Sequence, residues 1–300
     1  MIQNILTPLG SKNVLTPNVF YGRQLAKHLN IKLRILQTYP IDRAAYAHGG
    51  MVGGVAGPSI EPPLVDPLAF DVAATKKKLA GMLKKEFPEI QESEYEILVL
   101  PGPTGAILSD HRKSDEGQEL RSDLIVVNAD IEISDFETII AQAPEVLSRK
   151  APGSTLIVPR NYAYKPFERI TLALDEENAK EEIPVDNLVH ILEGYNANLD
   201  AMHVQGGSAE LVNKARDLIN NSLKATLSTS KISDFNLHTI TEDEMKRNNV
   251  KNDIEIFTND QCSDLLALIY REHGIFKRLF APGIRKQLIR ELTIPLLILK

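Results

Sequence analysis

The sequence has little of what supports disulfide, metal-cluster or membrane chemistry. Its 300 residues include one cysteine, Cys262, and no tryptophan, which excludes an internal disulfide framework and any site built from several thiolates. No apolar stretch approaches the roughly 20 residues that a membrane-spanning helix needs. Residues 1–9 also lack the basic segment and long apolar stretch of a secretory signal. We therefore expect a cytoplasmic chain without membrane contacts.

Basic clusters and enzyme motifs are scarce as well. The sequence has 34 Lys and Arg against 40 Asp and Glu, a formal net charge of −6, and the lysines at 76–78 fit the solvated face of a helix. Because nucleic acids are bound through clustered cations, a nucleic-acid partner is disfavoured. There is no nucleophile elbow, His-Glu-x-x-His or paired-carboxylate motif, and His111 and His203 lack partners at metal-ligand spacing. The sequence predicts neither a catalytic nor a metal centre.

What the chain does contain is an internal repeat of short apolar runs. The pairs of runs are residues 5–9 and 170–174 at an offset of 165, 28–36 and 194–202 at 166, 122–127 and 252–257 at 130, and 155–158 and 295–298 at 140. Each half therefore presents the same ordered series of candidate strands. The falling offset predicts about 36 extra residues between the second and fourth strands of the first half. They include the glycine-rich residues 48–58, a surface loop by composition.

Helical patterns fill the gaps between these runs. In the second half Val185, Leu188, Val189 and Leu192 recur at helical spacing, which predicts one buried helix face. Short apolar strands that alternate with such helices favour a parallel sheet covered on both faces. In sheets of this kind ligands bind outside the carboxyl ends of the strands.

The ordered runs, together with the closing segment at 273–299, resemble a tandem universal stress protein over nearly the whole chain. The resemblance implies two Rossmann-like α/β domains, each a five-stranded, mostly parallel sheet flanked by helices. We place them at residues 1–161, with a long loop at about 40–70, and at residues 162–300. The resemblance also implies an intramolecular pseudo-dimer, in which residues 154–158 and 294–299 pair antiparallel across a pseudo-twofold axis and cover both edges.

The nucleotide motif of that family is mostly absent. Nucleotide-binding members carry Gly-x2-Gly-x9-Gly-[Ser/Thr] after the fourth strand, where glycines let backbone amides and a helix N-terminus approach phosphates. With Gly283 as the third glycine, Tyr270 and His273 occupy the first two positions and Ile284 the hydroxyl position. In the first half, residues 130–144 contain no glycine.

The family also has an acidic residue at the end of its first strand. Asp175 stands there in the second half, whereas Gly10 stands there in the first. The resemblance therefore implies at most one weakened site, formed by Asp175, the strand end near Val204 and the turn at Gly283. The alternative is that Asp175 only caps the turn that follows it.

Other motifs have simpler explanations. Residues 53–59 lack a lysine after the last glycine, so we reject them as a nucleotide loop. Residues 101–105 predict a turn in which Thr104 begins the next helix. Cys262 is expected to be buried and inert in an apolar helix. Residues 273–278 form either a basic phosphate cradle or a solvent-facing helix.

The sequence thus predicts a non-enzymatic stress-response or regulatory protein. Nucleotide binding is lost in the first domain and doubtful in the second, and no cofactor is certain. One alternative is an adenine-nucleotide-binding protein, with ATP or AMP and weak hydrolase activity in the second domain. Another is an interaction scaffold for an unidentified protein partner, with residues 39–67 facing that partner. A further homodimer of the whole chain is left open.

Overall fold

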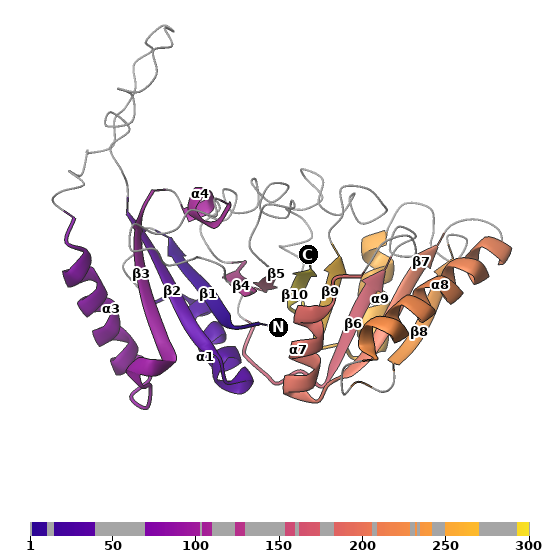
Figure 1. Cartoon of the computed structure of the whole chain (residues 1–300), viewed down its shortest axis with the longest axis horizontal. Helices are drawn as coiled ribbons and strands as arrows, with labels where there is room; N and C mark the ends of the chain where they lie inside the picture. The colour runs from indigo at the N-terminus through magenta and orange to yellow at the C-terminus, as the bar shows by residue number, and fades with distance from the viewer. Residues whose placement is uncertain are drawn as a thin grey trace, which may run out of the picture.

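The strands of the described residues form one continuous sheet (Figure 1). The computed structural model describes residues 2–10, 15–39, 70–102, 104–109, 124–129, 154–159, 162–174, 183–205, 209–228, 232, 235–241, 250–269 and 293–299. The strands of the first half are β1 (Asn4–Gly10), β2 (Lys32–Tyr39), β3 (Tyr95–Pro101), β4 (Leu124–Asn128) and β5 (Ser154–Val158). Those of the second half are β6 (Arg169–Leu174), β7 (Asn198–Gln205), β8 (Phe235–Thr241), β9 (Leu265–Ile269) and β10 (Leu296–Leu299). Their spatial order is β3-β2-β1-β4-β5-β10-β9-β6-β7-β8.

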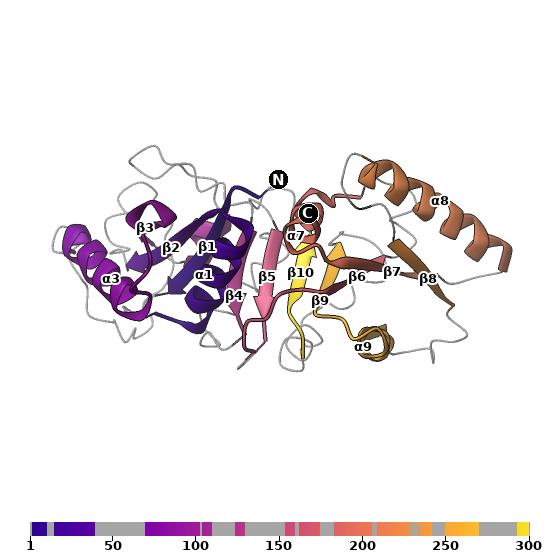
Figure 2. The ribbon, with the colours of Figure 1, turned by 90° about the horizontal axis from the view of Figure 1, so that it is seen from below.

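Helices cover both faces of this sheet. One face packs against α1 (Pro17–Leu29), α3 (Val72–Glu86), α7 (Asp186–Tyr195) and α8 (Ala209–Leu227), and the other against α4 (Thr104–Ser109) and α9 (Val250–Asp260). A short 3₁₀ turn, η3 (Glu92–Glu94), precedes β3. Figure 2 shows α8 and α9 on opposite sides of the sheet. Neighbouring strand residues alternate between the two cores, as Ile5 and Leu6 do, because successive side chains of a strand point to opposite faces.

All strand pairs are parallel except one. β5 and β10 pair antiparallel, with Leu156 opposite Leu297. The registers of β1 with β4 and of β6 with β9 make residues 141 apart equivalent in these strands. Leu156 and Leu297 are 141 apart, so equivalent residues face each other and the pseudo-twofold axis passes between them. The predicted pairing of the last strands and the α/β architecture of two Rossmann-like halves are confirmed, and this pairing joins their strands into a single sheet. The boundary between residues 161 and 162 stays a prediction.

One predicted strand is wrong. Residues 252–257 lie in α9, and the fourth strand of the second half is β9. Alternating Ile254 and Ile256 resemble a strand, but the helix buries Ile254 and Phe257 and leaves Ile256 51% exposed. The equivalent offsets are therefore 140 for the third strands and 141 for the fourth. The extra residues of the first half all precede β3, and the predicted excess of 36 is too large.

Three helices end in the same way, and the position of Cys262 at one of these ends corrects the prediction made for it. In α1, α7 and α9 the chain leaves the helix through a left-handed residue, namely Asn30, Asn196 or Cys262, at φ 53°, 52° and 51°. At each end, the following amide bonds a carbonyl five residues back, as Ser263 does to Thr258 at 2.8 Å. This Schellman geometry stops the helix and starts the next strand. Cys262 is exposed, so its expected burial within a helix is wrong.

The two halves also touch through α1 and α7. The ring of His28 stacks on Tyr195 at 3.9 Å between centroids. A Cβ on Gly194 would lie 2.4 Å from the Cδ2 of Leu29, so glycine at this position leaves room for the Leu29 side chain of α1. Residues 28 and 194 are equivalent, as are 29 and 195, at the offset of 166. Each contact is therefore the pseudo-symmetric counterpart of the other, the pattern of a twofold interface.

The segment that joins the halves is bound to both of them. Tyr164 packs edge-on against Tyr21 of α1 and exchanges a hydroxyl hydrogen bond of 2.8 Å with Tyr195 of α7. Lys165 forms an ion pair with Asp264, the residue immediately before β9. The described halves therefore form an intramolecular pseudo-dimer held by a strand pair, a helix pair and an aromatic cluster.

Two further observations bear on the sequence predictions. Residues 40–69 of the long loop predicted at about 40–70, which include the glycine-rich residues 48–58, lie outside the described residues. The residues on either side of it, Tyr39 and Phe70, stack with ring centroids 4.1 Å apart. Within the described ranges, no helix has both the length and the apolar composition that crossing a bilayer requires.

Candidate functional site

Topology points to two places where a ligand could bind. In each half the strand order reverses between the first and fourth strands, β1 and β4 or β6 and β9. The carboxyl ends of strands at such a switch point leave a crevice that commonly binds ligands. The carboxyl ends of the strands lie at the top of the sheet in Figure 1, where α4 follows β3. The two switch points are built from different residues.

In the first half, a proline weakens the strand pair at the switch point. β1 and β4 pair only at Ile5–Leu124 and Leu6–Ile125. By that register Pro8 stands opposite Val127, and the amide of residue 8 would be the donor for the carbonyl of Val126. Proline has no N–H. The ladder therefore lacks a donor at the point where a ligand crevice would open.

The side chain of Asn18 supplies the missing donor. Asn18 is 0% exposed in the first turn of α1, and its Nδ2 donates to the carbonyl of Pro8 at 2.7 Å and of Val126 at 3.5 Å. Its Oδ1 accepts a hydrogen bond from the hydroxyl of Thr16. All polar atoms of this amide are thus used inside the protein, and the crevice of the first half is bridged by a neutral side chain.

The second half has neither the proline nor the asparagine. β6 and β9 pair over four residues, from Ile170–Leu265 to Ala173–Leu268. Ala173 is equivalent to Pro8 and keeps its N–H, whereas Pro184 is equivalent to Asn18 and has no donor. Among the described residues of this half, no side-chain amide bridges the switch point. The two halves therefore differ in the chemistry they present at equivalent places.

The predicted site residues are only partly described. Asp175 and Gly283 lie outside the described residues, and Val204 lies near the end of β7, opposite Ile240 of β8. The equivalent of Val204 is Thr38, whose hydroxyl lies 2.9 Å from that of Thr104. Thr104 begins α4, so the predicted helix start is confirmed. The assembly of Asp175, Val204 and Gly283 into one site stays a prediction.

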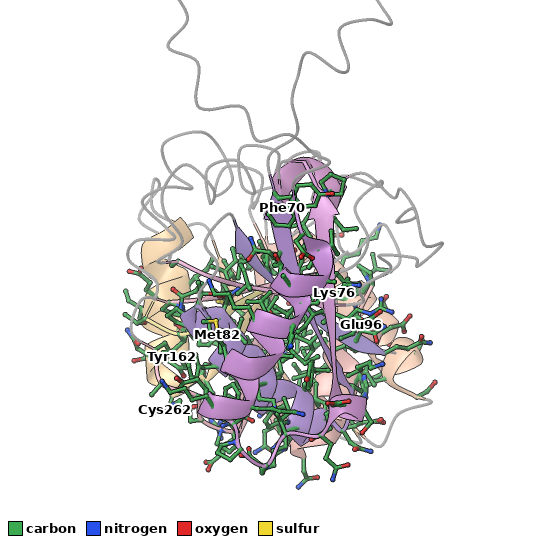
Figure 3. The ribbon with its side chains drawn as sticks, turned by 90° about the vertical axis from the view of Figure 1, so that its left-hand side faces the viewer. Phe70, Lys76, Met82, Glu96, Tyr162 and Cys262 are labelled. Carbon is green, nitrogen blue, oxygen red and sulfur yellow. The ribbon has the colours of Figure 1, made fainter. Side chains whose placement is uncertain are left out.

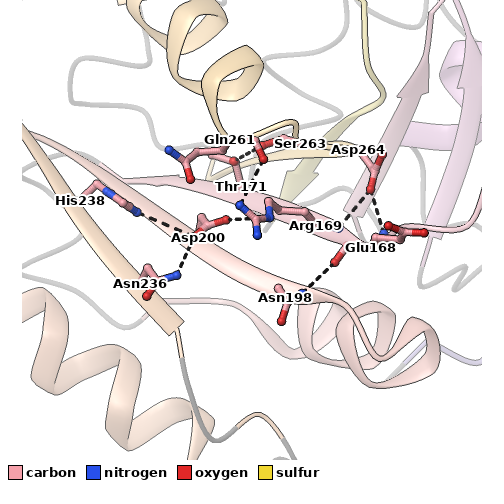
Figure 4. A network of polar contacts seen from close by, with 10 residues as sticks. All are labelled: Glu168, Arg169, Thr171, Asn198, Asp200, Asn236, His238, Gln261, Ser263 and Asp264. Carbon is pink, nitrogen blue, oxygen red and sulfur yellow. Dashed lines mark hydrogen bonds and ion pairs between the residues drawn. The ribbon is translucent and has the colours of Figure 1, made fainter.

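A second polar cluster lies between strands of the second half, towards their amino ends (Figure 4). Asp200 of β7 is 1% exposed. Its carboxylate accepts a hydrogen bond of 3.0 Å from Asn236 and lies 3.6 Å from the Nε of Arg169 and 3.8 Å from the Nε2 of His238. The nearby Arg169 offsets only part of the hydration that the buried carboxylate loses, because its Oδ2 accepts no hydrogen bond from the described residues. This cluster was not predicted from the sequence.

The first half has the same pair of positions with the charges rearranged. There Arg34 of β2 and Glu96 of β3 form an ion pair of 2.8 Å, at the places that Asp200 and Asn236 hold in the second half. No group of three or more His, Cys, Asp or Glu side chains within the described ranges could hold a metal ion. The Asp200 cluster joins β7 to β6 through Arg169 and to β8 through Asn236 and His238.

Asp264 fixes the start of β6 in the same region (Figure 4). Its Oδ2 accepts hydrogen bonds from the amides of Glu168 at 2.9 Å and Arg169 at 3.1 Å. Burial would raise the pKa of this carboxyl, but the hydrogen bonds from Lys165 and the two amides outweigh it, and the pKa of Asp264 lies below its ordinary value. The carboxylate is thus ionised and structural.

Comparison with known proteins identifies the fold. No family model matches the sequence, and no curated protein matches it significantly. A universal stress protein from Archaeoglobus fulgidus matches with 12% identity and a TM-score of 0.52, covering 99% of this chain and 96% of that chain. A functionally unknown protein from Pseudomonas aeruginosa PAO1 matches with 12% identity and a TM-score of 0.52, covering 100% and 92%.

A third match is one domain of a cotransporter. It is the cytoplasmic domain of a prokaryotic cation chloride cotransporter, with 10% identity and a TM-score of 0.51, covering 99% of this chain and 95% of that chain. These matches cover both halves of the chain. The predicted resemblance to tandem universal stress proteins is therefore confirmed at the level of the fold. At such identities the likeness concerns the fold and leaves function to be argued from the site.

Proposed function

We propose that this chain is a non-enzymatic regulatory protein of the universal stress protein type, in which the first half does not bind nucleotide. The observation that carries the proposal is the buried amide of Asn18, which bonds the carbonyls of Pro8 and Val126 across the first switch point. A nucleotide there would need free donors for its phosphates and an open crevice for its sugar. The amide of Asn18 uses both of its N–H donors inside the protein.

The sequence carries no recognised catalytic motif and the described residues hold no catalytic cluster, and both observations favour a regulatory role. The carboxylate of Asp264 is held by two backbone amides and Lys165, a contact that fixes a strand end. The same fold forms the cytoplasmic domain of a cation chloride cotransporter, a protein in which it accompanies another functional unit. We extend that pattern to this chain as a cytoplasmic module that acts on an unidentified protein partner. Its two domains would meet at residues 161 and 162.

A second candidate function is adenine-nucleotide binding, with weak hydrolysis, in the second half. Ala173 and Pro184 favour it, because neither supplies a side-chain bridge like that of Asn18. Asp175, Val204 and Gly283 would hold the ligand, with Asp175 at the ribose and Gly283 at the phosphates. The erosion of the glycine motif around Gly283 predicts that such binding is weak.

Calorimetric titration of ATP, ADP and AMP into nucleotide-stripped protein separates these functions. Asp175→Ala removes the candidate ribose contact. Asp186→Ala is the matched control, since Asp186 is an exposed carboxylate in the first turn of α7. Phosphate release is measured on the same samples.

Each outcome assigns a function. No binding heat at millimolar nucleotide supports the regulatory proposal without a nucleotide. Binding at one site per chain that Asp175→Ala abolishes and Asp186→Ala retains supports the second candidate. Binding at two sites per chain contradicts the proposal for the first half. Phosphate release that follows the protein through purification and is lost in Asp175→Ala contradicts the non-enzymatic role.

A further inference from the structure

The sheet ends in two edge strands that are equivalent in the internal repeat. β3 pairs with β2 over seven residues and β8 pairs with β7 over seven residues, in matching registers at the offset of 140. Figure 1 shows them at the two ends of the sheet. An edge strand exposes a row of backbone donors and acceptors that can pair with another strand. The two edges differ in how they are protected.

β3 carries features that disfavour pairing with another strand. Glu96 places a carboxylate on the edge strand, paired with Arg34, and Figure 3 shows Glu96 at this end of the molecule. Pro101 ends the strand and removes one N–H. Charges and prolines on edge strands are common protections against edge-to-edge association.

β8 lacks both protections. Asn236 and Thr241 stand where β3 has Glu96 and Pro101. Residues 235–241 contain no Lys, Arg, Asp, Glu or Pro, and β8 pairs without a bulge along its whole length. Within the described residues, no strand pairs with its outer side. The side chain of Asn236 is turned to the buried Asp200 of the neighbouring strand.

The residues of β8 whose backbone groups point outward can be identified from the equivalent residues of β3. The amide of Gly102 donates to the carbonyl of Tyr39 in β2 at 2.8 Å, so the amide of residue 101 points outward. Successive residues of a strand alternate in direction. The equivalent outward residues of β8 are Phe235, Leu237, Thr239 and Thr241.

We propose that the outer edge of β8 is an interface for a second copy of this chain, with the two β8 strands antiparallel and centred on His238. This register overlaps the whole strand. It pairs Leu237 with Thr239 of the second copy and Phe235 with Thr241 of the second copy, through all of the outward backbone groups. His238 then stands opposite its own counterpart.

A second copy fits this edge for two physical reasons. A strand edge is complementary to itself under a twofold axis, because each outward N–H meets an outward carbonyl of the copy. The chain has a net charge of −6, yet residues 235–241 bring no like charges together apart from His238 when it is protonated. The arrangement repeats the antiparallel contact that β5 and β10 already make.

Sedimentation velocity of the full chain tests the interface. We expect a concentration-dependent dimer that Thr241→Pro weakens at least ~10-fold, because one backbone donor is lost from each copy. The fold should tolerate this proline, since residue 241 points outward and β3 already carries Pro101 at the equivalent position. Circular dichroism checks that the variant is folded.

Oxidative cross-linking tests the register in a Cys262→Ser background. His238→Cys should form a disulfide-linked dimer, because directly opposite, non-hydrogen-bonded residues place their Cα atoms at a separation that a disulfide spans. Asn236→Cys lies on the same face of the same strand, but in this register it is four residues away from its own counterpart. It should not form a cross-link.

Several experimental outcomes would contradict the proposal. A monomer at every concentration up to ~1 mM would overturn it, because such an affinity is too weak for a specific dimer. A dimer that Thr241→Pro leaves unchanged would also overturn it. Equal cross-linking of His238→Cys and Asn236→Cys would refute the register. Association only with an added peptide would assign the edge to a different partner and refute the second copy.

Discussion

Replacement of Asn18 by alanine is the perturbation that probes the first switch point most directly. The variant removes the amide that donates to Pro8 at 2.7 Å and to Val126 at 3.5 Å. The carbonyl of Val126 gains no donor from the ladder in its place, because Pro8, which would supply it, has no N–H. Both carbonyls lie in the interior of the first half, where water does not replace the lost partner.

The expected cost follows from these contacts. A buried polar group left without its partner costs about 1–3 kcal/mol, and the bond to Val126 is the longer and weaker of the two. We therefore expect Asn18→Ala to lower the free energy of unfolding by about 2–4 kcal/mol. This is a large fraction of the ~5–15 kcal/mol that stabilises a typical domain.

Urea unfolding monitored by circular dichroism measures the loss. Asn187→Ala is the matched control, because Asn187 is also the second residue of its helix and is half-buried, with its Nδ2 donating to the hydroxyl of Ser154 at 3.1 Å. We expect the control to cost at most about 1 kcal/mol. If Asn18→Ala cost no more than Asn187→Ala, the argument that Asn18 replaces a missing backbone donor would be wrong.

Three further predictions follow from the described contacts. Cys262→Gly should stabilise the protein by about 0.5–1 kcal/mol in thermal unfolding, because glycine adopts the left-handed φ of 51° without strain; a loss of stability would contradict the assignment of Cys262 to the helix end. Gly194→Ala should be less stable than Gly81→Ala by about 1–2 kcal/mol, because its Cβ would force the buried Leu29 side chain of α1 to shift. Gly81→Ala, with open space around its Cβ, should stabilise the protein by about 0.5–1 kcal/mol. Equal effects would refute the contact between Gly194 and Leu29. The pKa of Asp264 is lower in the folded than in the unfolded protein. The carboxylate therefore contributes fully to the free energy of unfolding above the unfolded pKa, and this contribution is lost as the pH falls through the folded pKa. Unfolding titrations from pH 6 downward should show that Asp264→Asn loses less stability with acid than the parent, and parallel pH profiles would contradict this.

Much of the fold was predictable because it rests on local patterns. Apolar runs such as residues 5–9 and 170–174 are buried on both faces, as parallel strands between helix layers must be. Residues 252–257 misled the prediction because Ile254 and Ile256 alternate like a strand. Their helical state depends on the packing of Ile254 and Phe257 against the sheet, which periodicity over six residues does not reveal.

The candidate site was less accessible to sequence reasoning. The resemblance directed attention to glycines and to Asp175, whereas the first switch point is governed by Pro8 and Asn18. A proline within an apolar run is a signal that a ladder donor is missing. The identity of the side chain that replaces this donor depends on the register of β1 with β4, strands separated by more than 100 residues. Only the folded chain brings these groups together.

Hydrogen exchange with and without millimolar ATP, ADP and AMP tests the central claim that the two switch points differ in function. The account predicts no change in the exchange of peptides that cover β1 and β4, whether or not nucleotide binds elsewhere. Any protection should be confined to the ends of β6, β7 and β9. Nucleotide-dependent protection of β1 and β4 would contradict the account, because the bridge made by Asn18 would then have failed to close the first half.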